Sequence, residues 1–484
     1  MANAKTVDYA EIRNGMSQFD LSSRVEPNDE IALDRAFLPN AHRGVLDTRR
    51  SLVVGNRGMG KSFWTHALLN QQLRQKLATV YGLKALENAN VVIGFNGSDK
   101  VAAVAPTSDE IAVALAGGAD PDVIWQAVLL RGARTARKDP PTTSFAEAIR
   151  EVIDNPELYS CEMSALDDLL IREERSLLVT FDALDRLGRN WDQIRSLSQT
   201  LLSRVLRLQS FRSIRAKVFI RVDQFSDTEL FRFPDSSKLK NSSVHLRWEA
   251  EDLYGLMLFE LLRLDRPGQE LRRLARDTNT DLALPDDGKM GAMSTQPLES
   301  LINAIAGEFM GSHKKRGRVY TWIPLHLSDA ADTCSPRTFL RAWGAAATHT
   351  PSPTDKVVDH LGLSEGVRQA SRDRLVELQE DYPWIDPALH ALRGEFVPIE
   401  REQLLARWDQ GAVLQTILKD SASEPTKAPV NLEQSESLQG LLEAMKSIAV
   451  MEERANGKIN VPDIFRVEAG IKRKGGVAVP RASK

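Results

Sequence analysis

Short apolar runs alternate with longer segments of helical periodicity through the first half of the chain. Strand-like runs lie at 51–54, 90–95, 176–181 and 216–220. Apolar residues recur at helical spacing between them, at 62–80, 123–130, 145–171 and 191–210. Buried strands separated by helices predict parallel crossover connections, and therefore an α/β sandwich that binds its ligands at the carboxyl ends of the strands.

The pattern changes near residue 250, where helical periodicity takes over. We expect four parts: an N-terminal leader at 1–45, an α/β core at 46–250, a helical lid and helical region at 251–420, and a small winged-helix-like domain at 432–484. The last expectation rests on an apolar stripe over 438–451, a second helix start at Pro462 and basic residues around Gly475 and Gly476.

The composition is that of a soluble globular protein, with 42% hydrophobic residues, 27% charged residues and a net charge of −3. No apolar run is long enough to span a membrane, and the N-terminus lacks the apolar core of a signal peptide. Cys161 and Cys334 make neither a disulfide framework nor a thiol metal site. We therefore expect a cytoplasmic protein without a membrane partner.

The chain ends in a basic segment, although its net charge argues against general coating of nucleic acid. Such a segment is either a solvated tail or a local DNA-binding surface. Its basic residues are Lys472, Arg473, Lys474, Arg481 and Lys484.

The first strand leads directly into a glycine-rich loop that opens a helix. The loop matches the phosphate-binding pattern G-x-x-x-x-G-K-[ST] with Gly55, Asn56, Arg57, Gly58, Met59, Gly60, Lys61 and Ser62. Glycines let backbone N–H groups converge on a phosphate, and the helix N-terminus adds a favourable field. In such a loop Lys61 contacts the β- and γ-phosphates and the Ser62 hydroxyl coordinates Mg²⁺. Together with Phe63, which follows, the loop predicts a site for ATP and magnesium.

A P-loop needs a carboxylate at the end of a neighbouring strand to hold the metal. Asp182 follows the most strand-like run of the chain and is the residue we expect there. The next residue is Ala183, where many ATPases have a glutamate that polarises the attacking water. Asp185 is the nearest replacement, and it either serves as the base or caps the following helix.

Two arginines are candidates for sensing the γ-phosphate, because a planar guanidinium matches phosphate oxygens. Arg221 closes the strand at 216–220, where it either contacts the nucleotide or pairs with Asp223 on the surface. Arg337 lies in the stretch 335–340, which opens a helix with proline near its start, and from a lid it would reach back over the nucleotide.

These pieces, in this order, resemble the additional-strand P-loop ATPases, in the branch that contains the AAA+, STAND and KAP proteins. The loop 55–62 resembles the Walker A motif, and the strand ending at Asp182 resembles Walker B. The stretch 182–186 is similar to the Asp-Asp-Leu-Asp-Arg motif of KAP-type ATPases, with Ala183 as the departure. Arg221 resembles a sensor-1 arginine and Arg337 resembles one of sensor 2.

The resemblance implies an Mg²⁺-dependent ATPase in which Lys61, Asp182, Asp185, Arg221 and Arg337 take part in catalysis. We expect a nucleotide-controlled switch, in signalling or phage defence, that forms a homo-oligomer and acts on a separate effector protein. Alternatives are a DNA-acting, initiator-like AAA+ ATPase that uses its C-terminal domain, and a nucleotide-binding scaffold with little turnover.

Overall fold

The computed structural model describes residues 7–19, 36–188, 190–282, 295–422, 428–429, 432 and 437–475. The chain forms two compact units. The core unit comprises Ser22–Phe259 and Leu282–Ser294, and the helical unit comprises Met1–Leu21, Glu260–Asp281 and Thr295–Lys484. The boundary between them falls within helix α14 (Ala250–Leu262).

The core unit is built on a five-stranded parallel sheet, which confirms the expected α/β class. Its strands are β1 (Leu52–Val54), β2 (Ala89–Phe95), β3 (Ser176–Phe181), β4 (Ile214–Ile220) and β5 (Val244–His245), in the order β2-β3-β4-β1-β5. One strand, β4, therefore lies between β1, which leads into the P-loop, and β3, which ends at Asp182.

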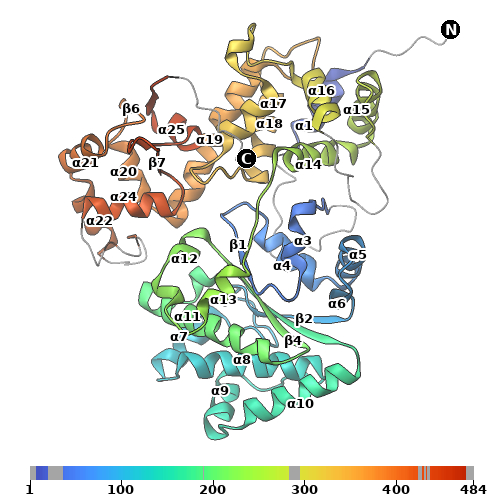
Figure 1. The fold of residues 1–484 in the computed structure, drawn as a ribbon, viewed down its shortest axis with the longest axis vertical. Coiled ribbons are helices and arrows are strands. Elements are labelled where there is room, and N and C mark those ends of the chain that lie inside the picture. Colours follow the sequence, from blue (N-terminus) through green and yellow to red (C-terminus); the bar gives the residue numbers. More distant parts are fainter. Residues whose placement is uncertain are drawn as a thin grey trace, which may run out of the picture. The chain divides into compact units, whose positions relative to one another are not determined.

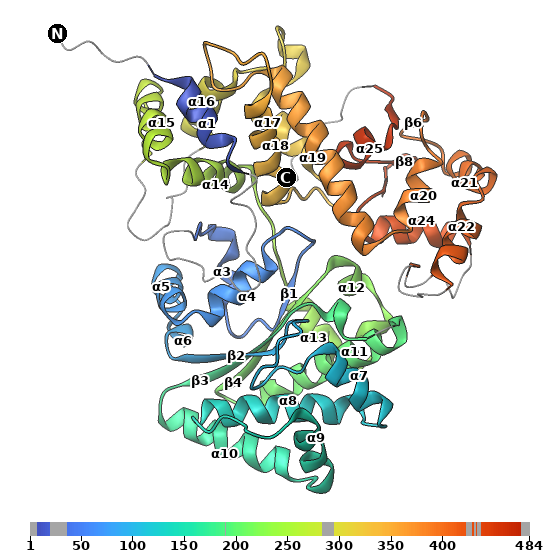
Figure 2. The ribbon, with the colours of Figure 1, turned by 180° about the vertical axis from the view of Figure 1, so that it is seen from behind.

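Alternate residues of these strands face opposite sides of the sheet, as a period of two requires. On one side, Val53, Leu178 and Phe219 pack against helices near the P-loop. A larger helical layer packs against the other side, where it contacts Leu52, Val179 and Val218. Figures 1 and 2 show the sheet between these layers. The first layer holds α3 (Arg43–Leu46), α4 (Lys61–Leu69), α5 (Gln71–Tyr81) and α6 (Lys84–Glu87), and the second holds α7 (Ser108–Ala116), α8 (Pro121–Ala136), α9 (Phe145–Asp154), α10 (Leu158–Arg172) and α11 (Trp191–Arg207).

Some elements differ from the sequence pattern. The expected helix at 62–80 is two helices, because Asn70 has an extended backbone between α4 and α5 and its side chain accepts a hydrogen bond from Leu73 N, which caps α5. The helical segment at 145–171 is likewise divided into α9 and α10. Strand β5 was not expected, since two residues are too short to leave a periodic signal.

The helical unit begins with α1 (Tyr9–Met16), whose N-cap is Asp8, and α1 packs against α15 and α18. This helix lies within the range expected only as a leader. Among its described residues, the unit also contains the α-helices α15 (Asp265–Asp277), α16 (Thr295–Ala306), α17 (Val319–Leu327), α18 (Pro336–Thr348), α19 (His360–Asp381), α20 (Ile385–His390), α21 (Arg401–Gln410), α22 (Val413–Ser421), α24 (Leu438–Ser447) and α25 (Asp463–Ala469). None of the described helices is long and apolar enough to cross a lipid bilayer.

The C-terminal segment packs with earlier parts of the helical unit. Strands β7 (Glu452–Glu453) and β8 (Ile459–Asn460) form an antiparallel pair between α24 and α25. Strand β9 (Lys472–Arg473) pairs in parallel with β6 (Phe396–Val397), and α25 packs against α19. The wing expected at Gly475 and Gly476 lies partly outside the described residues.

Helices α18 and α19 approach so closely that two glycines of α19 are needed. A Cβ on Gly366 would overlap the carbonyl oxygen of Ala342, and one on Gly362 would lie 2.9 Å from the carbonyl oxygen of Ala346. Both obstacles are helix backbone, which cannot move aside as a flexible side chain can. The glycines therefore set the distance between the two helices.

We predict that Gly366→Ala destabilises the protein by about 2–3 kcal/mol, because the added methyl group forces α18 and α19 apart. Ser364→Ala, on the exposed face of the same helix, is the matched control and should change stability little. Urea unfolding measures both. Equal stability of the two variants would contradict the proposed close packing.

Candidate functional site

The P-loop begins at the end of β1 and is held on both sides. Gly55 N donates to the carbonyl of Ile220 at 3.1 Å, and Leu246 N donates to that of Val54 at 2.8 Å. Gly58 and Gly60 have φ angles of 82° and 99°, which side-chain-bearing residues rarely adopt. Nothing would lie within 4 Å of a Cβ at Gly60. These positive φ angles let the loop turn into the start of α4, where backbone N–H groups of a helix N-terminus favour an anion.

The ammonium of Lys61 points back into the loop. Its Nζ donates to the carbonyl oxygens of Gly55 at 2.7 Å and Asn56 at 3.1 Å. The side chain is thus stretched across the loop interior, where phosphate oxygens are stronger acceptors than neutral carbonyls.

The hydroxyl of Ser62 and the carboxylate of Asp182 meet across the carboxyl edge of the sheet, 3.4 Å apart. The other carboxylate oxygen accepts a hydrogen bond from Ala183 N at 2.8 Å, and Asp182 is 8% exposed. A hydroxyl beside a fixed carboxylate is an oxygen ligand pair suited to Mg²⁺. The structure therefore brings together the two residues that the sequence suggests as metal ligands, and their role as ligands stays a prediction.

Burial shifts the two central charges toward their neutral forms. It lowers the pKa of Lys61, and the nearby charges of Asp182, Arg221 and Asp185 act on the same ammonium. It raises the pKa of Asp182, with Lys61 opposing that change. An anionic phosphate would favour the charged lysine, and a divalent cation would favour the charged carboxylate.

Asp185 and Arg221 also come together near Lys61. A guanidinium nitrogen of Arg221 lies 3.6 Å from an Asp185 carboxylate oxygen, and two others donate to Asp223 at 2.9 and 3.2 Å. Of the two readings of Asp185, helix capping does not apply, because Asn190 caps α11. Arg221 pairs with Asp223, as expected if it does not contact the nucleotide, and it also forms an ion pair with Asp185.

A turn that begins at Ala183 determines the position of Asp185 after β3. The φ angle of Ala183 is 56°, in the left-handed region that alanine seldom adopts. The short turn Leu184–Arg186 follows directly, and Arg186 O accepts a hydrogen bond from Ser108 at 2.8 Å. Strained backbone beside a candidate catalytic carboxylate is a feature that occurs at functional sites.

Arg337 belongs to the helical unit, at the start of α18, where the Ser335 side chain caps the helix. Its guanidinium lies 3.4 Å from the carboxylate of Glu377 in α19. Arg341, one turn later, pairs with Asp373 at 3.2 Å. Within its own unit, Arg337 thus stands in a row of ion pairs between α18 and α19.

A buried histidine supports the P-loop helix, and no motif pointed to it. The indole N–H of Trp64 in α4 donates to His42 Nδ1 at 3.1 Å. Because Nδ1 must then accept, Nε2 carries the proton and donates to the carbonyl of Arg247 at 2.8 Å. Trp248 stands edge-on to the same ring and donates to Met59 O in the loop. His42 therefore joins the segment before β1, the P-loop helix and the segment after β5.

A buried lysine holds the opposite end of the P-loop strand. Lys217 in β4 donates to the carbonyls of Asp47 at 3.0 Å and Arg50 at 2.7 Å, and burial lowers its pKa to about 7. These carbonyls belong to the turn that enters β1, so Lys217 fixes where that strand begins.

Comparison with known proteins adds little. Neither a family model nor a curated protein matches this chain. Among solved structures, the chain is similar to one described as the structure of the Aeropyrum pernix ORC2 protein in ADPNP-ADP complexes, with 12% identity over 89% of this chain and 91% of that one. The TM-score of 0.36 is too low to support a functional argument.

We predict that His42 makes folding stability depend on pH. Burial lowers its pKa from 6.5 to about 4. Between these values the unfolded chain binds a proton that the folded protein excludes, so the stabilisation is complete above pH 6.5 and is lost as the pH falls toward 4. The loss is about 3 kcal/mol. Urea unfolding of His42→Gln should show a shallower decline over this range, whereas His390→Gln, at an exposed position, should follow the parent protein. Parallel pH profiles for His42→Gln and the parent would refute the assignment.

Proposed function

We propose that this protein binds ATP with Mg²⁺ at the P-loop and hydrolyses the γ-phosphate. The observation that supports this most is the meeting of Ser62 with Asp182, at 3.4 Å, beside the buried ammonium of Lys61. Three strand ends contribute to this edge: β1 through the P-loop, β3 through Asp182, and β4 through Arg221.

Each side chain has a distinct role in the proposed reaction. Lys61 exchanges its two carbonyl acceptors for β- and γ-phosphate oxygens, while the loop 55–60 and Phe63 surround the phosphates. Ser62 and Asp182 would hold Mg²⁺, and the metal would neutralise charge that develops on the phosphates. Water attacks the γ-phosphorus and passes its proton to Asp185. The bond from the γ-phosphorus to the β–γ bridging oxygen breaks, and ADP and inorganic phosphate are released.

Arg221 gives the proposed site a way to report nucleotide state. In the structure its guanidinium is held by Asp223 and Asp185. A γ-phosphate competes for the same nitrogens, and its capture of Arg221 frees Asp185 to orient water. Loss of the phosphate restores the ion pairs. Arg337 is the second proposed sensor, and it must leave Glu377 to act.

We extend the proposal to a nucleotide-controlled switch that assembles as a homo-oligomer and signals to a separate effector, as in phage defence. It is supported by the ion pairs of Arg221 and Arg337, which either arginine could exchange for a contact with the γ-phosphate. A DNA-acting, initiator-like ATPase is the second candidate, and the adjacent exposed cations Lys314, Lys315 and Arg316 favour it. A scaffold with little turnover is the third, and Ala183 is its support.

Phosphate release from ATP should require both Lys61 and Asp182. We predict that Lys61→Ala and Asp182→Asn each lower the steady-state rate at least about 100-fold, because each removes a charge that contacts the transferred group or its metal. Removing Mg²⁺ with a chelator should have an equal effect. Lys84→Gln, an exposed lysine in α6, is the control and should keep the parent rate. A Lys61→Ala protein that turns over normally would exclude this site as the source of hydrolysis.

Variants of Asp185 distinguish an ATP-hydrolysing enzyme from a nucleotide-binding scaffold. In a single-turnover assay, we expect Asp185→Ala and Asp185→Asn to retain ATP binding and to cleave about 10²–10⁴-fold more slowly, because the proton acceptor is lost. Asp192→Asn, at an exposed aspartate nearby, should cleave at the parent rate. No cleavage by the parent protein would favour the scaffold, and full cleavage by Asp185→Ala would remove Asp185 from the mechanism.

A further inference from the structure

Residues 308–319 form a narrow antiparallel loop that joins α16 to α17. Phe309 and Arg318 form an antiparallel bridge, Met310 N donates to Gly317 O at 2.9 Å, and Val319 N donates to Glu308 O at 2.9 Å. The loop tip, residues 312–316, is exposed throughout and contains the single turn Lys314–Arg316. We call this segment the basic loop.

The tip carries three adjacent positive charges, Lys314, Lys315 and Arg316. No acidic residue occurs in the sequence from Phe309 to Ser328. Among the described residues, no carboxylate forms an ion pair with any of these three side chains, in contrast to Arg318 at the loop base. That arginine lies 2.6 Å from Glu299 and 3.7 Å from Glu308. The base of the loop is neutralised internally, and the tip keeps its charge in a protein whose net charge is −3.

Glycines shape the tip. Gly311 and Gly317 have φ angles of 139° and 92°, so a side chain at either position would be strained. A Cβ on Gly317 would lie 3.0 Å from the ring of Trp322, and one on Gly311 would lie 3.3 Å from the side chain of Arg316. The backbone therefore turns tightly and presents the three basic side chains from a defined base.

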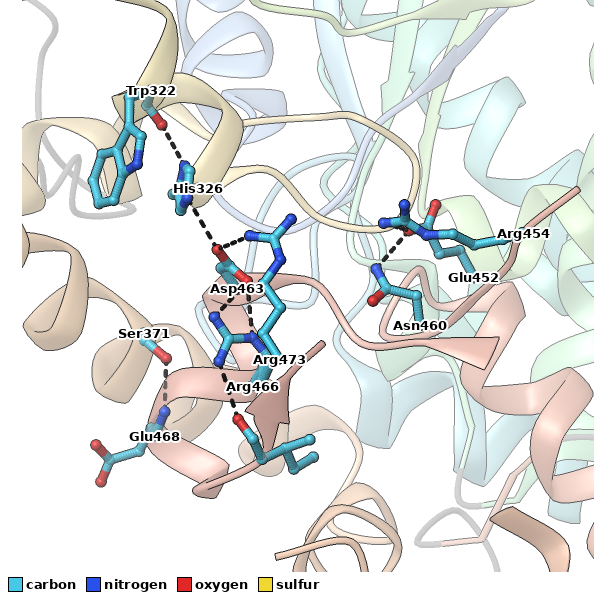
Figure 3. A network of polar contacts seen from close by, with 11 residues as sticks. Trp322, His326, Ser371, Glu452, Arg454, Asn460, Asp463, Arg466, Glu468 and Arg473 are labelled. Carbon is cyan, nitrogen blue, oxygen red and sulfur yellow. Dashed lines mark hydrogen bonds and ion pairs between the residues drawn. The ribbon is translucent and has the colours of Figure 1, made fainter. Parts of the chain in front are cut away.

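The basic residues of the C-terminal segment are placed differently, as Figure 3 shows. Asp463 accepts hydrogen bonds from Arg466 at 2.8 Å and Arg473 at 3.0 Å, and it lies 3.2 Å from His326. These guanidinium groups hold α25 and β9 together and are partly buried. Lys472 lies over the ring of Phe396, at 5.4 Å. Arg481 and Lys484 lie outside the described residues.

We propose that the basic loop, through Lys314, Lys315 and Arg316, binds the phosphate backbone of duplex DNA. Cationic side chains on a strand-like arm that carries no paired acid provide the charge complementarity that phosphate contacts need. Duplex DNA presents such phosphates as a regular array, with one negative charge per about 1.7 Å of helix axis.

Other anionic partners fit the loop less well. A membrane-binding loop inserts apolar side chains, and single-stranded nucleic acid stacks on aromatic rings. The tip from Ser312 to Arg316 contains no aliphatic side chain, and its one aromatic ring is the imidazole of His313, whereas a single strand stacks successive bases on several rings. A tight protein interface would need a large aromatic or aliphatic anchor at its centre, which the tip also lacks. The contact is therefore with backbone phosphates and is independent of base sequence.

This DNA contact is separate from the ATP site and does not rest on hydrolysis. The experiment uses the full chain and a short labelled duplex without nucleotide, and measures binding by fluorescence anisotropy from roughly 50 to 200 mM salt. The triple variant Lys314→Gln, Lys315→Gln, Arg316→Gln should bind more weakly and lower the slope of log K against log salt by about 2 to 3. Lys61→Ala should bind DNA as the parent does, so that failure of the ATPase proposal leaves this test intact.

Matched variants identify the source of any charge effect. The control variant Lys84→Gln, Lys138→Gln, Lys419→Gln removes the same charge from exposed lysines elsewhere and should keep the parent slope. An unchanged slope in the basic-loop variant, or a loss of binding only in Lys472→Gln, Lys474→Gln, would overturn the proposal. So would tighter binding to single-stranded DNA, duplex RNA or anionic phospholipid vesicles than to duplex DNA.

Discussion

The site depends on one spatial constraint: the P-loop of β1 and the carboxylate at the end of β3 must meet although β4 lies between their strands. Parallel pairing aligns all three strand ends at one edge of the sheet. The loop then reaches across β4, and Ser62 comes within 3.4 Å of Asp182. The same arrangement puts Arg221, at the end of the intervening strand, beside Asp185. The order of the strands thus determines which side chains can share one phosphate.

Three arginines of interest in the sequence each have a carboxylate partner within their own unit. Arg221 is held by Asp223 and Asp185, Arg337 by Glu377, and Arg473 by Asp463. For the two proposed sensors, such pairs set the cost of moving toward a phosphate, because a partly buried ion pair must break before a new contact forms. Lys61 differs, since it donates to the neutral carbonyl oxygens of Gly55 and Asn56, which a phosphate can replace.

Much of this architecture could be predicted from the sequence where a signal is local. Buried strands are apolar runs, so β1 to β4 stand out, and glycine spacing identifies the P-loop because only certain residues allow its backbone. Signals that arise from tertiary contacts were missed. Strand β5 has two residues, which is too short for the alternation of apolar and polar positions to be seen. His42 belongs to no motif, since its role comes from its contacts with Trp64 and Arg247. The contact of Asp185 with Arg221 follows a turn in which Ala183 has a left-handed backbone, and the local sequence does not predict that conformation. In the C-terminal basic segment, Arg473 is paired with Asp463, a tertiary contact that the sequence does not indicate. Lys314 to Arg316 are a short basic run within a helical region, and nothing local distinguishes them from other solvated charges.

The central claim is that the P-loop recognises a nucleotide through its phosphates, and the most direct measurement is thermal unfolding with Mg²⁺ and ATP, ADP or AMP. ATP and ADP should raise the melting temperature of the parent protein, with a stabilisation of about 2.7 kcal/mol when the ligand is at 100 times its Kd. AMP, which has no β-phosphate for Lys61 and the loop, should leave it unchanged. Lys61→Ala should lose most of the shift with ATP. Equal stabilisation by AMP and ATP, or an undiminished ATP shift in Lys61→Ala, would contradict phosphate recognition at this loop.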